Sequence, residues 1–246
     1  VSLLSYDKVK AFNERGANVG DGAFGENLVV EGLDFRSLPV GTRLYAGSAE
    51  LVMTQIGKEC HSHCAIYKRM GECIMPKEGV FAKVVKEGII RPGDVMRMGL
   101  PAQDRPLTAA IITLSDKGAR GERKDESGPA AKEMLEQAGY EVVETLLIPD
   151  EPALLKTQLI RLADGRQLDL VLTSGGTGFS LRDQTPEATL AIADRNAPGI
   201  AEAIRFKSLQ ITDRAMLSRG ASVIRGRTLI VNLPGSPKAV RESLGF

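Results

Sequence analysis

The sequence contains no tryptophan, and aromatic residues make up only 4% of its 246 positions. Proteins that hold single-stranded nucleic acid stack its bases on aromatic side chains, so this composition argues against such a platform. The formal net charge is +1, which gives no strong positive field toward nucleic acid or an anionic membrane. We therefore expect neither a nucleic-acid partner nor a membrane partner.

Long apolar runs and a leader are also missing. The sequence has no run of 18 apolar residues and no charged-then-apolar start, which predicts a cytoplasmic protein that is not exported. Its three cysteines are an odd number, which favours free thiols in a reducing compartment over a disulfide framework. The sequence starts at Val1 rather than at a methionine and stops at Phe246, just after a helix should begin. We expect both ends to be cut.

The chain divides into two regions with different hydrophobic patterns. Residues 1–98 contain short apolar runs between glycine-rich turns, a pattern typical of a small barrel or sandwich. In residues 107–246, continuous apolar runs alternate with helical patterns, which favours a mostly parallel sheet covered by helices. Residues 99–106 hold two prolines and form the predicted linker. The predicted class is α/β, with a β-barrel-like module followed by a mostly parallel α/β sandwich.

A glycine-rich loop follows one of the apolar runs of the second region, "LDLVLT". In open α/β sheets, ligands lie at the carboxyl ends of the strands, where this loop would begin. Glycines let backbone N–H groups approach an anion closely. A tight turn that merely needs glycine is the alternative, but Arg182 and Asp183 close behind favour an anion or phosphate site. The loop residues are Ser174, Gly175, Gly176, Thr177 and Gly178.

Three other loops of the second region leave predicted strands. If the sheet is parallel, all four loops meet at one edge. Carboxylates beside a phosphate repel it unless Mg²⁺ lies between them, so Asp150 and Asp183 are the candidate metal ligands. Helix capping is the alternative for each aspartate. The three loops contain Thr113, Ser115, Asp116, Asp125, Ser127 and Gly128, then Asp150, and then Asn232, Gly235, Ser236 and Lys238.

The motifs of the second region resemble one known family. The pieces "TLSDKG", "IPDE", "TSGGTGFSLRDQTPEAT", "LSRG" and "LIVNLPGSPKAV" are together similar to the molybdopterin adenylyltransferases of molybdenum cofactor synthesis. The resemblance implies ATP and molybdopterin as substrates, Mg²⁺ as cofactor, a homotrimer formed through this domain, and the molybdenum insertion protein as a candidate partner. It places the two acidic positions on Asp150 and Asp183, and the binding loops on Gly175, Gly176 and Gly178 and on Pro234, Gly235 and Ser236.

The first region contains one cluster of metal-ligand and thiol residues. Its members are Cys60, His61, His63, Cys64 and Cys73. A structural zinc site is one interpretation, and free, partly buried thiols are another. We favour a reactive thiolate at Cys60, because Lys58 and His61 beside it would stabilise its negative charge.

Residues 1–98 resemble a MOSC domain through "VSLLS", "GAFGENLVVEGLDFRSLPVGTRLYAGSAELVMTQIGKEC" and "EGVFAKVVKEGIIRPGDVM". The resemblance implies a barrel-like module whose characteristic cysteine is Cys60. That cysteine would bind molybdenum cofactor or carry sulfur. The whole chain is then expected to be an enzyme of cofactor synthesis. A non-catalytic carrier that holds finished cofactor is the alternative.

Overall fold

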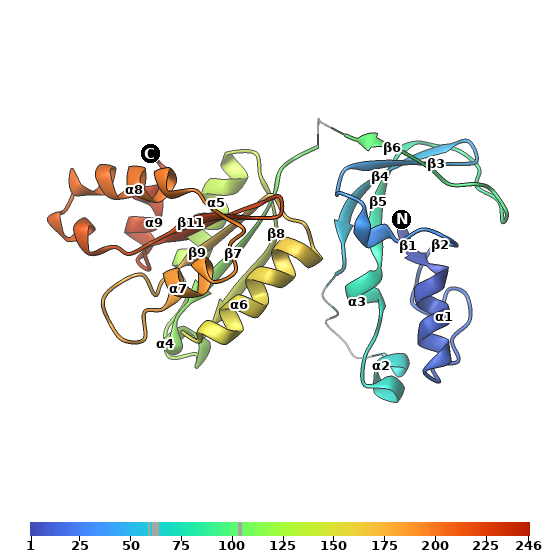
Figure 1. Cartoon of the computed structure of the whole chain (residues 1–246), viewed down its shortest axis with the longest axis horizontal. Coiled ribbons are helices and arrows are strands. Elements are labelled where there is room, and N and C mark those ends of the chain that lie inside the picture. The colour runs from blue at the N-terminus through green and yellow to red at the C-terminus, as the bar shows by residue number, and fades with distance from the viewer. Residues whose placement is uncertain (59, 61–63, 103–104) are drawn as a thin grey trace. The chain divides into compact units, whose positions relative to one another are not determined.

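The computed structural model describes residues 1–58, 60, 64–102 and 105–246. It contains two compact units, Val1–Arg105 and Pro106–Phe246, which are coloured blue to green and green to red in Figure 1. Among the described residues, no helix has the length and apolar character needed to cross a membrane. Each unit contains one six-stranded sheet.

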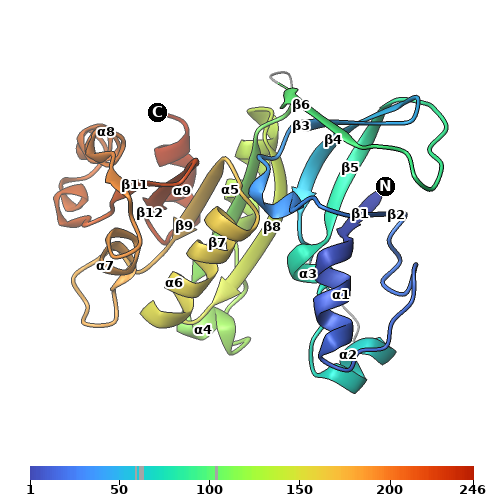
Figure 2. The same cartoon turned by 45° about the vertical axis from the view of Figure 1, so that its right-hand side comes forward.

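The sheet of the first unit is a curled half barrel (Figure 2). Its order is β2-β1-β5-β4-β3-β6, with β1 parallel to β2 and the other pairs antiparallel. In the part of the chain that the structure describes, β2 and β6 are edge strands, so the sheet is open where a barrel-like module was expected. The strands are β1 (Ser2–Ser5), β2 (Leu28–Val30), β3 (Thr42–Ala46), β4 (Ala49–Ile56), β5 (Val80–Lys86) and β6 (Arg97–Pro101).

Short helices complete the first unit. The first helix is α1 (Tyr6–Glu14), and Gly16 follows it with a φ of +92°. The other helices are η1 (Phe35–Ser37), α2 (Ala65–Met70) and α3 (Met75–Glu78). The predicted linker, residues 99–106, is wrong at its start, because β6 continues to Pro101 through pairing with β3.

The sheet of the second unit has the order β10-β11-β12-β9-β7-β8. The four strands β8, β7, β9 and β12 are parallel, and β10 and β11 are antiparallel additions at one edge. This arrangement confirms the predicted mostly parallel sheet. The strands are β7 (Thr108–Leu114), β8 (Glu141–Ile148), β9 (Leu170–Ser174), β10 (Arg195–Asn196), β11 (Ser222–Arg225) and β12 (Thr228–Leu233).

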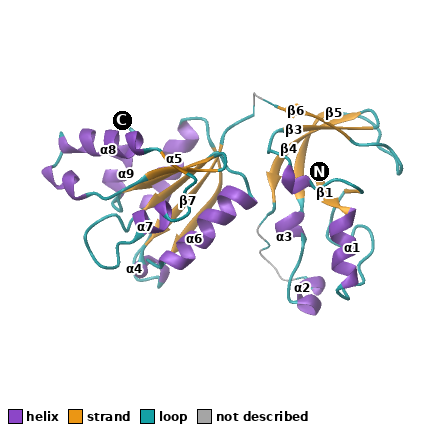
Figure 3. Cartoon of the chain, viewed as in Figure 1, coloured by secondary structure: helices purple, strands orange, loops and turns teal. Residues whose placement is uncertain are grey.

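Helices cover both faces of this sheet (Figure 3). Successive residues of a strand point to opposite faces, so Ile112 packs with Leu155 and Leu159 of α6, whereas Ile111 packs with the other layer, which includes Ala131 of α5. The helices are α4 (Asp116–Ala119), α5 (Ser127–Gln137), α6 (Pro152–Ile160), η2 (Arg161–Gly165), α7 (Thr185–Leu190), α8 (Pro198–Leu209), η3 (Asp213–Leu217) and α9 (Pro237–Leu244).

The strand order creates a switch point. After β7 the chain continues to β8 on one side, and β9 then pairs with β7 on the other side. Loops that leave such neighbouring strands diverge, and the crevice between them is where ligands bind in open α/β sheets. The glycine loop after β9 lies at this crevice.

Candidate active site

A cleft of about 720 Å³ lies at the carboxyl ends of the parallel strands. All four predicted loops contribute to it, because parallel pairing brings their strand ends to the same edge of the sheet. Residues from the four sequence predictions that line it are Thr113, Ser115, Asp125, Ser127, Asp150, Gly175, Gly176, Asp183, Gly235 and Ser236. Further lining residues are Leu114, Gly118, Arg123, Lys124, Glu126, Leu147 and Pro237.

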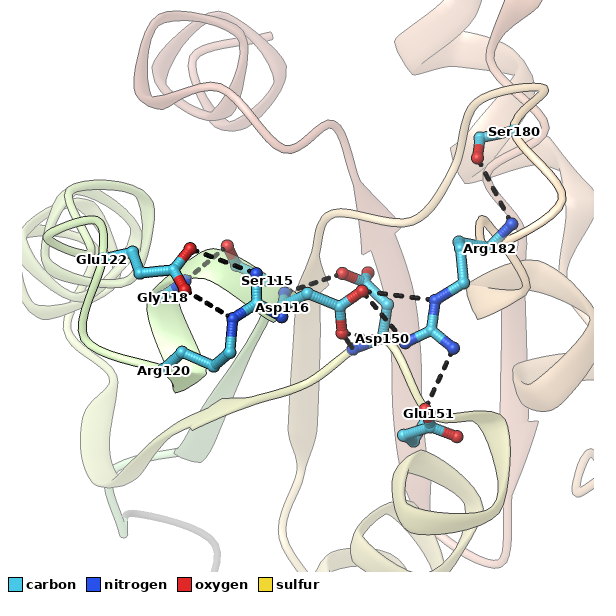
Figure 4. A network of polar contacts seen from close by, with 9 residues as sticks. All are labelled: Ser115, Asp116, Gly118, Arg120, Glu122, Asp150, Glu151, Ser180 and Arg182. Atoms are coloured by element: carbon cyan, nitrogen blue, oxygen red, sulfur yellow. Dashed lines mark hydrogen bonds and ion pairs between the residues drawn. The ribbon is translucent and has the colours of Figure 1, made fainter.

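Two aspartates beside the cleft bind each other's backbone (Figure 4). The N–H of Asp116 donates to Oδ2 of Asp150 at 3.0 Å, and the N–H of Asp150 donates to Oδ1 of Asp116 at 3.0 Å. Asp116 begins α4, and Asp150 lies just after β8. This reciprocal pair joins the loops after β7 and β8.

Arg182, which lies between the glycine loop and α7, completes this network (Figure 4). Its Nη2 donates to Oδ1 of Asp116 at 2.9 Å, its Nε donates to Oδ2 at 3.2 Å, and its Nη1 donates to Glu151 at 3.0 Å. The hydrogen bonds from Arg182, helped by the N–H of Asp150, lower the pKa of the Asp116 carboxyl. Asp116 is therefore an ionised partner of the loop arginine.

The Asp150 carboxyl shows the opposite tendency. Partial burial raises its pKa, and the charges of Asp116 and Asp183 raise it further, against the lowering effect of the Asp116 N–H. Asp183 lines the same cleft, and its Oδ2 accepts the N–H of Ser180 at 3.0 Å. Like charges gathered in this way favour a bound cation.

Magnesium fits this donor set. No group of three histidine, cysteine, aspartate or glutamate side chains suited to a metal occurs within residues 1–58, 60, 64–102 and 105–246. Mg²⁺ is usually held by one or two carboxylates together with substrate phosphates and water. Asp150 and Asp183 would supply such a pair, and the buried Oγ1 of Thr113, which has no hydrogen-bond partner, leaves a further oxygen in the cleft.

The start of α5 forms another wall of the cleft. Oδ1 of Asp125 accepts the N–H groups of Ser127 and Gly128, both at 3.0 Å. The Ser127 hydroxyl donates to the carbonyl of Gly235 at 2.8 Å. The Ser127 bond holds the β12 loop against α5, and the Asp125 carboxylate satisfies two N–H groups in the first turn of that helix.

Some predicted binding residues lie outside the lining of this cleft. Asp116, Ser174, Thr177, Gly178 and Pro234 are not among the lining residues of this cleft. The Ser174 hydroxyl donates to the carbonyl of Pro234 at 2.9 Å. Ser236 lines the cleft while its Oγ accepts the N–H of Ala239, which caps α9. These contacts hold the loops on which the lining residues lie.

Gly176 has a different reason to be glycine from the one the sequence suggests. From the bare backbone, we expect a valine at this position to occupy ligand space. We also expect the fold of that variant to stay intact, and the structure contradicts this part: the φ of Gly176 is +64°, and an added Cβ would collide with Oγ1 of Thr185. Glycine is required because left-handed backbone and close packing both exclude a side chain.

Two cations of the cleft, Arg123 and Lys124, escape the sequence analysis. They lie in "GERKDESG", between the end of α4 and the start of α5. Two adjacent basic residues in a loop that follows a predicted strand could have indicated this position in the cleft. Both side chains can neutralise substrate phosphates.

The three cysteines of the first unit form no disulfide within the part of the chain that the structure describes. Cys60 and Cys64 are exposed, and Cys73 is half-buried. Hydrogen bonds from the backbone of Tyr67 and Ile66 lower the pKa of Cys64, whereas burial raises the pKa of Cys73. His61 and His63 lie outside the described residues.

The fold and cleft define an α/β protein with an open cleft at the carboxyl ends of parallel strands. Residues 110–246 match the family described as "Probable molybdopterin binding domain", and residues 1–97 match the MOSC domain. The chain belongs to this molybdopterin-binding family, with a MOSC domain joined to it.

Relatives with the same second unit are named molybdopterin adenylyltransferase. The protein of Escherichia coli (strain K12) is 45% identical over 141 residues, which cover 56% of this chain and 72% of the relative. The protein of Helicobacter pylori (strain ATCC 700392 / 26695) is 41% identical over 136 residues, which cover 54% of this chain and 77% of the relative.

Solved structures show the same fold as the second unit. The molybdopterin biosynthesis enzyme MoaB from Thermus thermophilus is 53% identical, with a TM-score of 0.53 over 56% of this chain and 87% of that one. The molybdopterin biosynthesis Mog protein from Mycobacterium ulcerans is 42% identical, with a TM-score of 0.52. The match covers 56% of this chain and 90% of that one.

Proposed function

We propose that the second unit adenylylates molybdopterin with ATP. A terminal phosphate oxygen of molybdopterin attacks the α-phosphorus of ATP, a new P–O bond forms, and the bond to the bridging oxygen of the β-phosphate breaks. The products are adenylylated molybdopterin and pyrophosphate. The attacking phosphate is already anionic, so no side chain has to remove a proton from it.

One observation carries this proposal: a single cleft at the switch point of the sheet is lined by glycine backbone, by Arg123 and Lys124, and by carboxylates that include Asp150 and Asp183. The N–H group of Gly176 and the side chains of Arg123 and Lys124 would orient phosphates, while the N–H of Gly175 is bound to the carbonyl of Leu233. Asp150 and Asp183 would hold Mg²⁺, which neutralises phosphate charge when it is bound. The residues thus act by position and charge.

Pyrophosphate release tests the proposal. The full chain is mixed with ATP and molybdopterin, with and without Mg²⁺, and pyrophosphate is measured over time. We expect release only when all three are present. No release in the complete mixture would contradict adenylylation.

The MOSC unit favours a second candidate, a carrier that holds finished cofactor without catalysis. Such a carrier would bind molybdopterin or molybdenum cofactor and leave ATP intact. We also propose that Cys60, which is exposed, binds the cofactor or carries sulfur. Native mass spectrometry of the chain with cofactor would show the bound mass, and its loss in Cys60→Ser would assign the site.

We propose that these tasks divide between domains 1–98 and 107–246, in a cytoplasmic protein that forms a homotrimer through the second domain. The molybdenum insertion protein would accept its product. Sedimentation analysis of the full chain would give the trimer mass or exclude it.

A further inference from the structure

Arg219 binds the glycine loop from outside the cleft. Its backbone N–H donates to the carbonyl of Thr177 at 3.0 Å, its Nε donates to the carbonyl of Gly178 at 2.8 Å, and its Nη2 donates to the carbonyl of Asp183. Residues 175–184 lie in neither a helix nor a strand, so their carbonyl groups need other partners. One residue therefore satisfies three carbonyls of this loop.

The segment that presents Arg219 is itself anchored. Nη1 of Arg205 in α8 donates to the carbonyl of Gly220 at 2.7 Å, and Oδ1 of the buried Asn232 accepts the N–H of Ala221 at 3.1 Å. Nη1 of Arg219 also pairs with Glu187 of α7. The guanidinium thus joins the segment before β11, in which Arg219 lies, to the loop after β9 and to α7.

The positions of these carbonyls show what the contacts do. Gly178 and Asp183 are the two ends of a short turn, and one guanidinium binds both ends. We propose that Arg219 is a positioning residue, which closes this turn and thereby aims the Asp183 carboxylate into the cleft. This inference rests on the proposed function, in which Asp183 holds Mg²⁺. A lysine cannot replace the planar fork of donors.

Hydrogen exchange of the full chain without ligands tests the closure directly. In Arg219→Lys, peptides that cover residues 176–184 are expected to exchange faster than in the unchanged protein. Arg225→Lys is the matched control, since Arg225 also binds a carboxylate, of Asp164, and a backbone carbonyl, of Ile192. Equal exchange of the loop in all three proteins would overturn the proposal.

Kinetics test the consequence for Asp183. Arg219→Lys is expected to lower kcat for pyrophosphate release by about tenfold to a hundredfold, and to raise the Mg²⁺ concentration needed for half-maximal ATP binding in calorimetry. The KM for molybdopterin should change by less than about twofold. Unchanged kcat and Mg²⁺ dependence in a folded variant would overturn the positioning role.

Two further variants separate the possible failures. If Asp183→Asn keeps full turnover, the proposed role of Asp183 fails; if Asp183→Asn is impaired and Arg219→Lys is normal, only the positioning role fails. Should Arg219→Lys not fold, Glu187→Gln loosens the same guanidinium while its carbonyl contacts remain. We expect it to shift loop exchange in the same direction by less, and an unchanged rate would contradict the proposal.

Discussion

The two units place their reactive side chains in different ways. In the second unit, Thr113, Asp150, Gly175 and Gly235 are far apart in the sequence, yet all line one cleft because their strands are parallel. In the first unit, the three cysteines lie in the single connection between the antiparallel strands β4 and β5. A parallel sheet gathers distant residues at one edge, whereas an antiparallel connection keeps its chemistry local.

The donor atoms differ as well. The second unit offers carboxylates, hydroxyls and cations, which suit Mg²⁺ and phosphates. The first unit offers thiols, which suit softer metals or sulfur chemistry. A substitution at one lining residue of the second unit should therefore disturb the whole cleft. Replacement of one cysteine in the first unit should change only the chemistry of that thiol.

The largest effect is expected for Asp183→Asn. The amide keeps the shape of the side chain but removes the charge that would hold Mg²⁺, so turnover should fall by about a hundredfold or more. Molybdopterin affinity should stay nearly normal in calorimetry. The exposed Asp213→Asn in η3 is the control, and near-normal turnover of Asp183→Asn would remove this residue from the metal site.

The next effect concerns the stability of the glycine loop. Gly176 and Gly226 both have positive φ, but an added Cβ is crowded only at Gly176. Alanine in left-handed backbone costs roughly 1–2 kcal/mol at either site, and overpacking should add about 1–3 kcal/mol at Gly176. Denaturant unfolding of the two alanine variants gives the difference. Equal losses would show that the loop relaxes around the new side chain.

The next prediction concerns the order in which the three thiols of the first unit react. Iodoacetamide labelling should be slowest at Cys73, because this thiol is half-buried and its pKa is raised. Cys64, whose pKa is lowered, should react faster. We still expect Cys60 to react fastest. Timed labelling with mass spectrometry ranks the three thiols, and fastest labelling at Cys64 would transfer the sulfur role to it.

Zinc makes a different forecast for the same experiment. If the cysteines and histidines bound zinc, a chelator would expose all three thiols together. Labelling with and without chelator near neutral pH compares these outcomes. If the labelling rates are the same with and without chelator, zinc does not shield these thiols.

The smallest effect is a shift in the titration of Asp150. Its raised pKa means that the ionised carboxylate opposes folding, so its contribution to stability is full at low pH and is lost as pH rises through its pKa. Asp116→Asn removes a negative neighbour but keeps the N–H bond, and should lower the pKa of Asp150. Carbon NMR of the metal-free protein measures the Asp150 titration in the unchanged chain and in the variant, and an unchanged midpoint would show that the charge of Asp116 does not raise the pKa of Asp150.

Much of the second unit follows from local patterns. Leu155, Leu159 and Leu162 repeat at helical spacing, and all three are fully buried as that spacing predicts. The apolar runs that became β7 and β9 placed the glycine loop at a strand end. By contrast, β10 and β11 have only two and four residues, too few for a period to be visible in the sequence.

The side-chain network was beyond sequence reasoning for another reason. Arg182 and Asp116 are 66 positions apart, and nothing in either motif indicates that they pair. Their contact depends on how two loops meet at the sheet edge, and the crowding of Gly176 by Thr185 depends on how the loop folds back on the start of α7. Such contacts are set by tertiary packing, as is the reciprocal pair that Asp116 forms with Asp150.

The identity of the product tests the central claim most directly. The full chain is incubated with molybdopterin, ATP and Mg²⁺, and the bound and released molecules are identified by mass spectrometry. Adenylylated molybdopterin with an equal amount of pyrophosphate is the expected result. Bound molybdopterin that stays unmodified beside intact ATP would contradict adenylylation and identify the chain as a carrier.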